Sequence, residues 1–208
     1  MKSYRQLCGV AKALDLVGDR WTLLIIRDLL IGPMRFSEIE NSLQGITTNL
    51  LAARLKHLSF LGLIEKQGAS KHDPYRLTVC GLSLEKVVFA LGEFGWQFLD
   101  LKDYSTIRSL RWAMLSLKRR LQPPFTDISI QFSCEASDYA VVLKNNIKEV
   151  TATRLPLPDL RISASETQLL KLIATLPHKL KVIPAVEIHG DPGAWEHLVD
   201  AARRSPVA

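Results

Sequence analysis

The residues best suited to bind a partner lie in segment 45–58, within a stretch that has no Asp or Glu between Glu40 and Glu65. Its leucines repeat at i, i+4 and i+7 and therefore share one side of a helix: Leu51, Leu55 and Leu58. At 100° per residue, Asn49 and Lys56 fall on the opposite side. An amide can bond to an adenine edge, and a Lys can reach a guanine or a phosphate. The pattern predicts a helix that binds the major groove of DNA.

The segments around this helix predict a winged helix-turn-helix. Residues 36–43 favour a two-turn helix, and Thr47 is a suitable N-cap for the second helix over 47–60. Residues 63–78 contain two short strand patterns joined by a polar loop, which is typical of a hairpin wing. The alternative is a generic small α+β domain whose charges are only solvated.

The expected partner of this unit is double-stranded DNA carrying an operator sequence. Segment 46–78 holds five Lys and Arg against two Asp and Glu, whereas the net charge of +6 alone does not localise a binding site. Arg54 lies nearer the leucines, so we expect it to pair within the domain. We predict that the DNA-contacting residues are Arg35, Thr48, Asn49, Lys56, His57, Lys66, Lys71, His72 and Arg76.

Four segments in one order and without gaps carry a family resemblance. They are residues 8–30 (CGVAKALDLVGDRWTLLIIRDLL), residues 32–39 (GPMRFSEI), the helix with the three leucines, and the motif Leu77-Thr78-x-x-Gly81. Residues 5 to about 100 resemble the HxlR-type transcriptional regulators. That family usually has Pro after the first Cys, where this chain has Gly9. The resemblance implies a dimeric regulator that binds DNA.

A long helix predicted over 80–100 carries two apolar stripes, and two stripes need two partners. The longer stripe consists of Leu84, Val87, Val88, Leu91, Phe94 and Phe98. The resemblance implies that one partner is the domain's own core and the other a second subunit, with the helix after Cys8 contributing. We expect the homodimer contacts at Leu82, Phe89 and Trp96. A helix buried within a larger monomer is the alternative.

Cys8 is the cysteine to which the resemblance assigns a role. In HxlR-type regulators a cysteine at this position often senses electrophiles or oxidants, because it lies near the dimer interface. Lys12 follows one helical turn later and could favour the thiolate. The alternative is a small apolar residue at the start of a helix.

Residues 105–208 predict a second, smaller domain with a sheet. Residues 128–132 alternate apolar and polar, and Ser165-x-x-Gln168 is a capping box before an apolar helix. With the ending His189-Gly190-Asp191-x-x-x-Trp195-x-x-Leu198, this domain resembles the sterol-carrier-protein-like fold. That fold implies an apolar tunnel, which holds a hydrophobic small-molecule effector or is a lost pocket reused for packing, so the domain either binds a ligand or has a structural, dimer-supporting role. Trp112 and Trp195 are candidate pocket walls, although core positions explain both more simply.

The predicted fold class is therefore α+β: a winged helix-turn-helix domain over 1–104 and a sterol-carrier-like sheet domain over 105–208. No apolar run approaches 18 residues, so we expect a cytoplasmic protein with no membrane partner. The three cysteines and five histidines show no metal-site spacing, and no nucleophile or phosphate-loop motif occurs. We therefore expect no metal, no cofactor and no enzymatic activity.

A different class of function stays open beside DNA binding. A sheet domain with an apolar tunnel could make the protein a carrier of hydrophobic ligands, and the winged-helix half would then mediate protein contacts. A helix that binds a protein typically exposes apolar anchors. The acid-free polar side of segment 45–58 favours DNA instead.

Overall fold

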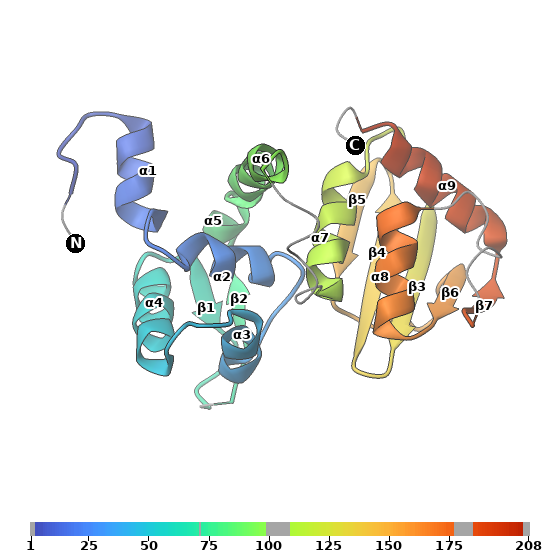
Figure 1. The fold of residues 1–208 in the computed structure, drawn as a ribbon, viewed down its shortest axis with the longest axis horizontal. Helices are drawn as coiled ribbons and strands as arrows, with labels where there is room; N and C mark the ends of the chain where they lie inside the picture. The colour runs from blue at the N-terminus through green and yellow to red at the C-terminus, as the bar shows by residue number, and fades with distance from the viewer. Residues whose placement is uncertain (1–2, 71, 99–108, 177–184, 206–208) are drawn as a thin grey trace. The chain divides into compact units, whose positions relative to one another are not determined.

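A computed structural model of the chain describes residues 3–70, 72–98, 109–176 and 185–205 (Figure 1). The chain divides into two compact units, Met1–Phe94 and Gly95–Ala208, here called unit 1 and unit 2. The boundary expected at residues 104 and 105 falls outside the described residues. Within the described part, no helix is long and apolar enough to cross a membrane.

Unit 1 has the element order of a winged helix-turn-helix, as predicted. Its elements are α1 Gly9–Val17, α2 Thr22–Leu29, α3 Phe36–Ser42, α4 Thr48–Phe60, β1 Ile64–Lys66, β2 Tyr75–Leu77, α5 Val79–Leu82 and α6 Glu85–Trp96. Strands β1 and β2 are antiparallel, with Ile64 opposite Leu77. Met34 adds a bridge to Tyr75, so the residues just before α3 are attached to the wing. Sequence reasoning did not foresee this bridge.

The core of unit 1 lies under the leucine side of α4. Leu51, Leu55 and Leu58 are buried, together with Ile25, Ile26 and Ile39 from α2 and α3. Asp28 is buried among them, and its carboxylate accepts hydrogen bonds from Ser42 Oγ at 2.7 Å and Arg27 Nε at 2.9 Å. Because a buried charge is costly without partners, both bonds stabilise the Asp28 carboxylate, and the bond from Ser42 also joins α3 to α2.

Two interruptions shape the helices of unit 1. Helix α2 begins at Thr22, because Trp21 just before it has a left-handed φ of 80° and interrupts the helical backbone. The long helix expected from Cys80 is two helices, α5 and α6, separated at Ser83 and Leu84. Ser83 Oγ donates to the carbonyl oxygen of Cys80 at 2.6 Å, a local bond that competes with helical hydrogen bonding.

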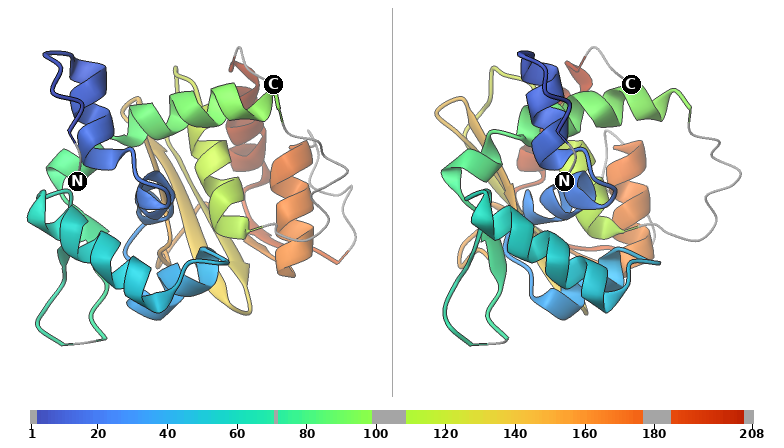
Figure 2. Two further views of the ribbon diagram at one scale, coloured as in Figure 1. Left: turned by 60° about the vertical axis from the view of Figure 1, so that its left-hand side comes forward. Right: turned by 90° about the vertical axis from the view of Figure 1, so that its left-hand side faces the viewer.

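The described residues of unit 2 form a five-stranded sheet and three helices. Its elements are α7 Leu110–Arg120, β3 Ile128–Cys134, β4 Ser137–Lys144, β5 Ile147–Thr151, β6 Leu160–Ser163, α8 Glu166–Thr175, β7 Glu187–Gly190 and α9 Pro192–Arg203. The strand order is β5-β4-β3-β6-β7, antiparallel throughout except for the β3–β6 pair. Helices α7, α8 and α9 all lie on one face of this sheet (Figure 2). The strand pattern over 128–132 and the helix predicted after Ser165 are confirmed, as β3 and α8.

The two faces of the sheet differ in chemistry. On the helix side, Phe132 packs edge-on against Trp195 with ring centroids 6.4 Å apart, and both side chains are buried. On the other face, the buried Gln131 donates to the carbonyl oxygen of Tyr139 at 3.0 Å and accepts from Leu155 N at 2.7 Å. Gln131 therefore fixes the connection from β5 to β6 where it crosses this face.

Candidate nucleic-acid interface

Helix α4 presents the polar side that the sequence predicted. Gly45 has φ of 90° in the turn before it, and Thr47 Oγ1 caps the helix by accepting from Leu50 N at 3.4 Å. Asn49 and Lys56 are exposed on the side opposite the buried leucines. The small side chains of Ala52 and Ala53 are exposed between them. This surface has an amide and an ammonium group at positions where a major groove could approach closely.

Two other residues of α4 bind partners within the protein, and a third is half-buried. The hydroxyl of Thr48 donates to Glu40 Oε1 at 2.6 Å, so an acidic group from α3 stands beside the start of α4. His57 is half-buried, and its Nε2 is buried without a hydrogen-bond partner among the described residues. Arg54 Nη1 pairs with Asp19 at 2.7 Å, with side chains 23% and 29% exposed. The expectation that Arg54 pairs within the domain is confirmed.

Sequence reasoning missed that Glu40 lies beside the start of α4. The stretch after Glu40 has no acid, but the helix-turn-helix folds back and returns this carboxylate to Thr48. The signal in the sequence was that Glu40 and Thr48 lie eight residues apart on either side of a tight turn. Thr48 is therefore a weaker candidate for a phosphate contact than Asn49, because its hydroxyl hydrogen is already donated.

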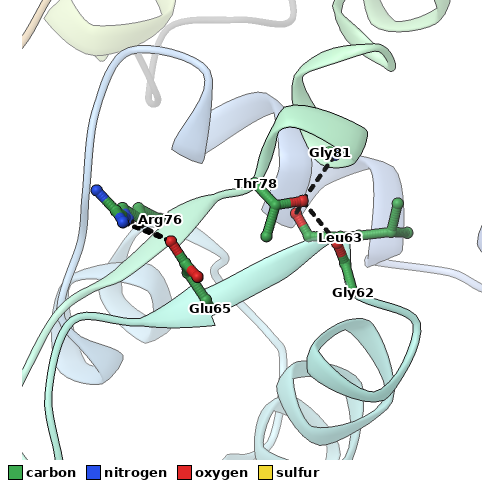
Figure 3. A network of polar contacts seen from close by, with 6 residues as sticks. All are labelled: Gly62, Leu63, Glu65, Arg76, Thr78 and Gly81. Atoms are coloured by element: carbon green, nitrogen blue, oxygen red, sulfur yellow. Dashed lines mark hydrogen bonds and ion pairs between the residues drawn. The ribbon is translucent and has the colours of Figure 1, made fainter.

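The wing carries cations, but one of them is neutralised locally. Arg76 Nε and Nη2 lie 2.7 and 2.6 Å from Glu65 Oε1 across the two strands (Figure 3). Lys66 Nζ lies 5.7 Å from the ring centre of Tyr75, and His72 is exposed. Lys71, expected at the wing tip, lies outside the described residues.

Arg35 stands at the start of α3. Its side chain is exposed, and its backbone N donates to Glu38 Oε2 at 2.6 Å, which satisfies one of the first amides of that helix. This bond uses the backbone N of Arg35, so the exposed guanidinium can still contact a phosphate, although Glu38 lies one turn away.

Helix α6 has no buried residue, which differs from the expectation that one of its stripes enters the core of its own domain. Phe89 is half-buried, whereas Leu82 and Trp96 are exposed, Trp96 by 51%. Phe94 is 63% exposed, and other large apolar side chains of α6 and α1 are exposed as well: Val87, Leu91, Val10 and Leu14. Both helices therefore carry large apolar side chains that are exposed in the described part of the chain.

Cys8 is the N-cap of α1 and is exposed. Hydrogen bonds from the backbone amides of Ala11 and Val10 lower the pKa of its thiol below the usual value. The sequence had suggested Lys12 as the cause, and the structure replaces it with the amides at the start of the helix. The thiolate is favoured by backbone geometry rather than by a side-chain charge.

The described residues of unit 2 form an open surface pocket. Its volume is about 300 Å³, and its lining is mixed polar and apolar: Ser133, Cys134, Glu135, Ser163, Ala164, Ala185 and Glu187. Trp195, expected as a pocket wall, is instead 1% exposed in the core against Phe132, and Trp112 is half-buried on α7. Within the described residues, no cluster of three or more His, Cys, Asp or Glu side chains could hold a metal ion.

Many cations of unit 2 bind carbonyl groups of its own backbone. Arg120 donates to the carbonyl oxygen of Ile173 at 2.7 Å, and Arg203 donates to that of Leu176 at 3.2 Å. Lys148 Nζ donates to Leu121 O at 2.7 Å. Because these carbonyls lie at or next to the carboxyl ends of α7 and α8, the cations stabilise helix ends. Charge in unit 2 is therefore weak evidence for nucleic-acid binding.

Comparison with known proteins agrees with the geometry of unit 1. Residues 16–103 match the family described as HxlR-like helix-turn-helix. The chain is 40% identical over 104 residues to the uncharacterized HTH-type transcriptional regulator MT3179 of Mycobacterium tuberculosis, covering 48% of this chain and 65% of that protein. The HTH-type transcriptional regulator YodB of Bacillus subtilis is 35% identical over 94 residues, covering 44% of this chain and 84% of YodB.

A solved structure also matches this region. It is the quinone-bound YodB from B. subtilis, with a TM-score of 0.40 and 35% identity, covering 44% of this chain and 100% of that chain. A second relative in Bacillus subtilis, the uncharacterized HTH-type transcriptional regulator YvaP, is 33% identical over 93 residues, which cover 43% of this chain and 85% of YvaP. The chain belongs to the HxlR-like helix-turn-helix family.

Proposed function

We propose that the chain acts as a dimeric transcriptional regulator that binds a palindromic operator with α4 and the wing. The observation that carries the proposal is the division of α4 into a buried leucine side and an exposed side with Asn49 and Lys56. Asn49 fits an adenine edge, and Lys56 fits a guanine or a phosphate. Arg35, Lys66, His72 and Arg76 would follow the flanking backbone, with Arg76 exchanging Glu65 for a phosphate.

Dimerisation is supported by the uncovered apolar surface of α6 and α1. Phe94 and Trp96 are more than half exposed, and such side chains on one helix are typical of an interface. A two-fold axis would place two α4 helices about 34–36 Å apart, which matches successive major grooves on one side of DNA. A Phe94→Glu protein that stays dimeric by light scattering at micromolar concentration would argue for another interface.

Two further parts of the proposal concern control. Cys8 would sense oxidants or electrophiles, which its lowered pKa and its exposure support. Unit 2 would take the sterol-carrier-like fold, which the placement of its three helices on one sheet face supports. A hydrophobic effector, or a carrier function, has no comparable observation in its favour, because Trp195 and Phe132 fill the described interior.

The deciding experiment begins with genomic DNA captured by the purified full-length protein and sequenced. Enrichment of one palindromic sequence supports the proposal, and random enrichment contradicts it. The double variant Asn49→Ala, Lys56→Ala then tests the helix that contacts the bases. If the double variant binds the enriched sequence as tightly as the unaltered protein, α4 is not the recognition helix.

A further inference from the structure

One hydroxyl joins two backbone segments of unit 1 at the base of the wing. Thr78 Oγ1 donates to the carbonyl oxygen of Gly62 at 2.6 Å and lies 3.3 Å from that of Leu63 (Figure 3). It also accepts a hydrogen bond from Gly81 N at 3.1 Å. The backbone N of Thr78 donates to Leu63 O at 3.1 Å. These four residues, Gly62, Leu63, Thr78 and Gly81, are called the Thr78 junction below.

The backbone of the Thr78 junction is closely packed, so its shape cannot change without moving the neighbouring backbone. Gly81 is buried, and a Cβ atom at this position would overlap the carbonyl oxygen of Leu63. Gly62 has a left-handed φ of 67°, which favours glycine there as well. The lack of a side chain at Gly81 therefore allows two backbone segments to approach each other, and the Thr78 hydroxyl connects them.

The two segments that meet here belong to different parts of unit 1: one follows α4, and the other begins α5. Gly62 follows α4 directly, and Leu63 N donates to Leu58 O of that helix at 3.0 Å. On the other side, Thr78 is the N-cap of α5, which leads through Ser83 and Leu84 into α6. One side chain thus binds both the end of the helix that faces DNA and the start of the arm formed by α5 and α6.

The direction of that arm depends strongly on its base. Because no residue of α6 is buried, the unit 1 core holds α6 weakly along its length. Its 12 residues span ~18 Å at 1.5 Å per residue. A rotation of ~10° at the base would move the far end of α6 by ~3 Å, close to the ~3.4 Å rise of one base step.

We infer that Thr78 is a positioning residue that sets the angle between α4 and the arm, and through the dimer sets which spacing between operator half-sites is bound. The inference extends the proposed function and depends on it. A residue with only a structural role would lower stability and weaken binding equally at every spacing. A positioning residue changes the preference among spacings instead.

The test uses the full-length protein and operators whose half-sites are separated by the natural spacing or by one or two base pairs more or less. Thr78→Val removes the hydroxyl at nearly constant shape, and Thr78→Ser keeps it. We expect Thr78→Val to bind an isolated half-site within about twofold of the unaltered protein, while its preference for the natural spacing falls at least fivefold. Thr78→Ser should restore the preference.

A second variant, Thr78→Asp, tests the inference if Thr78→Val fails to fold. Thr78→Asp can still cap α5, because its carboxylate accepts from Gly81 N, but it cannot donate to Gly62 O at neutral pH. It should show the same loss of spacing preference. An unchanged spacing preference in a folded Thr78→Val or Thr78→Asp protein overturns the inference. Failure of the unaltered protein to prefer any palindrome contradicts the proposed function itself, which keeps the two failures distinct.

Discussion

Lys56 gives the sharpest quantitative test of the DNA-binding surface. Each phosphate contact made by a Lys releases counterions and contributes about 0.9 to the slope of log affinity against log salt. Lys56 is exposed on α4, and a dimer would present two copies. Lys56→Ala should therefore flatten the slope by about 1.8, so that the cost of raising salt from 50 to 200 mM falls by about twelvefold.

The measurement is the anisotropy of a labelled operator titrated with protein at several salt concentrations. Lys171→Ala is the matched control, because it removes an exposed Lys from α8 in unit 2 and should leave the slope unchanged. If both variants keep the slope of the unaltered protein, Lys56 does not contact phosphate. If both variants flatten the slope equally, the slope reflects the total charge of the protein rather than a contact made by α4.

Further predictions address stability and thiol chemistry. Leu55→Ala should lower the free energy of unfolding by ~2–5 kcal/mol in urea denaturation, because it leaves a cavity under α4. Trp195→Ala should cost ~3–5 kcal/mol, and a cost near zero would return Trp195 to a pocket wall. Asp19→Asn, which weakens a partly exposed ion pair, should cost less than ~1 kcal/mol by the same assay. With Cys80 and Cys134 replaced by Ser, Cys8 should react with iodoacetamide at lower pH than an unstructured cysteine peptide, because a lowered pKa leaves more thiolate at each pH below the usual value.

Local patterns predicted most of the helices and strands. The leucine repeat gave α4 its buried side, and Ser165 and Gln168 form the capping box with Ser165 N donating to Gln168 Oε1 at 3.0 Å. Both depend on residues within a few positions of each other. The strand order and the parallel pairing of β3 with β6 could not be predicted, because pairing partners such as Ile130 and Leu160 lie far apart in the chain.

The candidate site was predictable in its side chains but not in their partners. Exposure of Asn49 and Lys56 followed from helical periodicity. The ion pair of Arg76 with Glu65 depends on the register of the hairpin, and the Thr48–Glu40 bond depends on how α3 meets α4. Composition alone could not show that Glu65 pairs with Arg76 or that Glu40 accepts a hydrogen bond from Thr48.

The last helix of unit 2 has a consequence for synthesis on the ribosome. Helix α9 supplies Trp195 to the core, and Gln122 N, just after α7, donates to Ala201 O at 3.0 Å. Arg204 then donates to Pro124 O at 2.6 Å. Helix α7 is translated before the other described elements of unit 2. The residues that follow it cannot complete their packing until α9 has been translated. Unit 1 precedes unit 2 in the chain and can fold first, while unit 2 still exposes apolar surface that chaperones recognise.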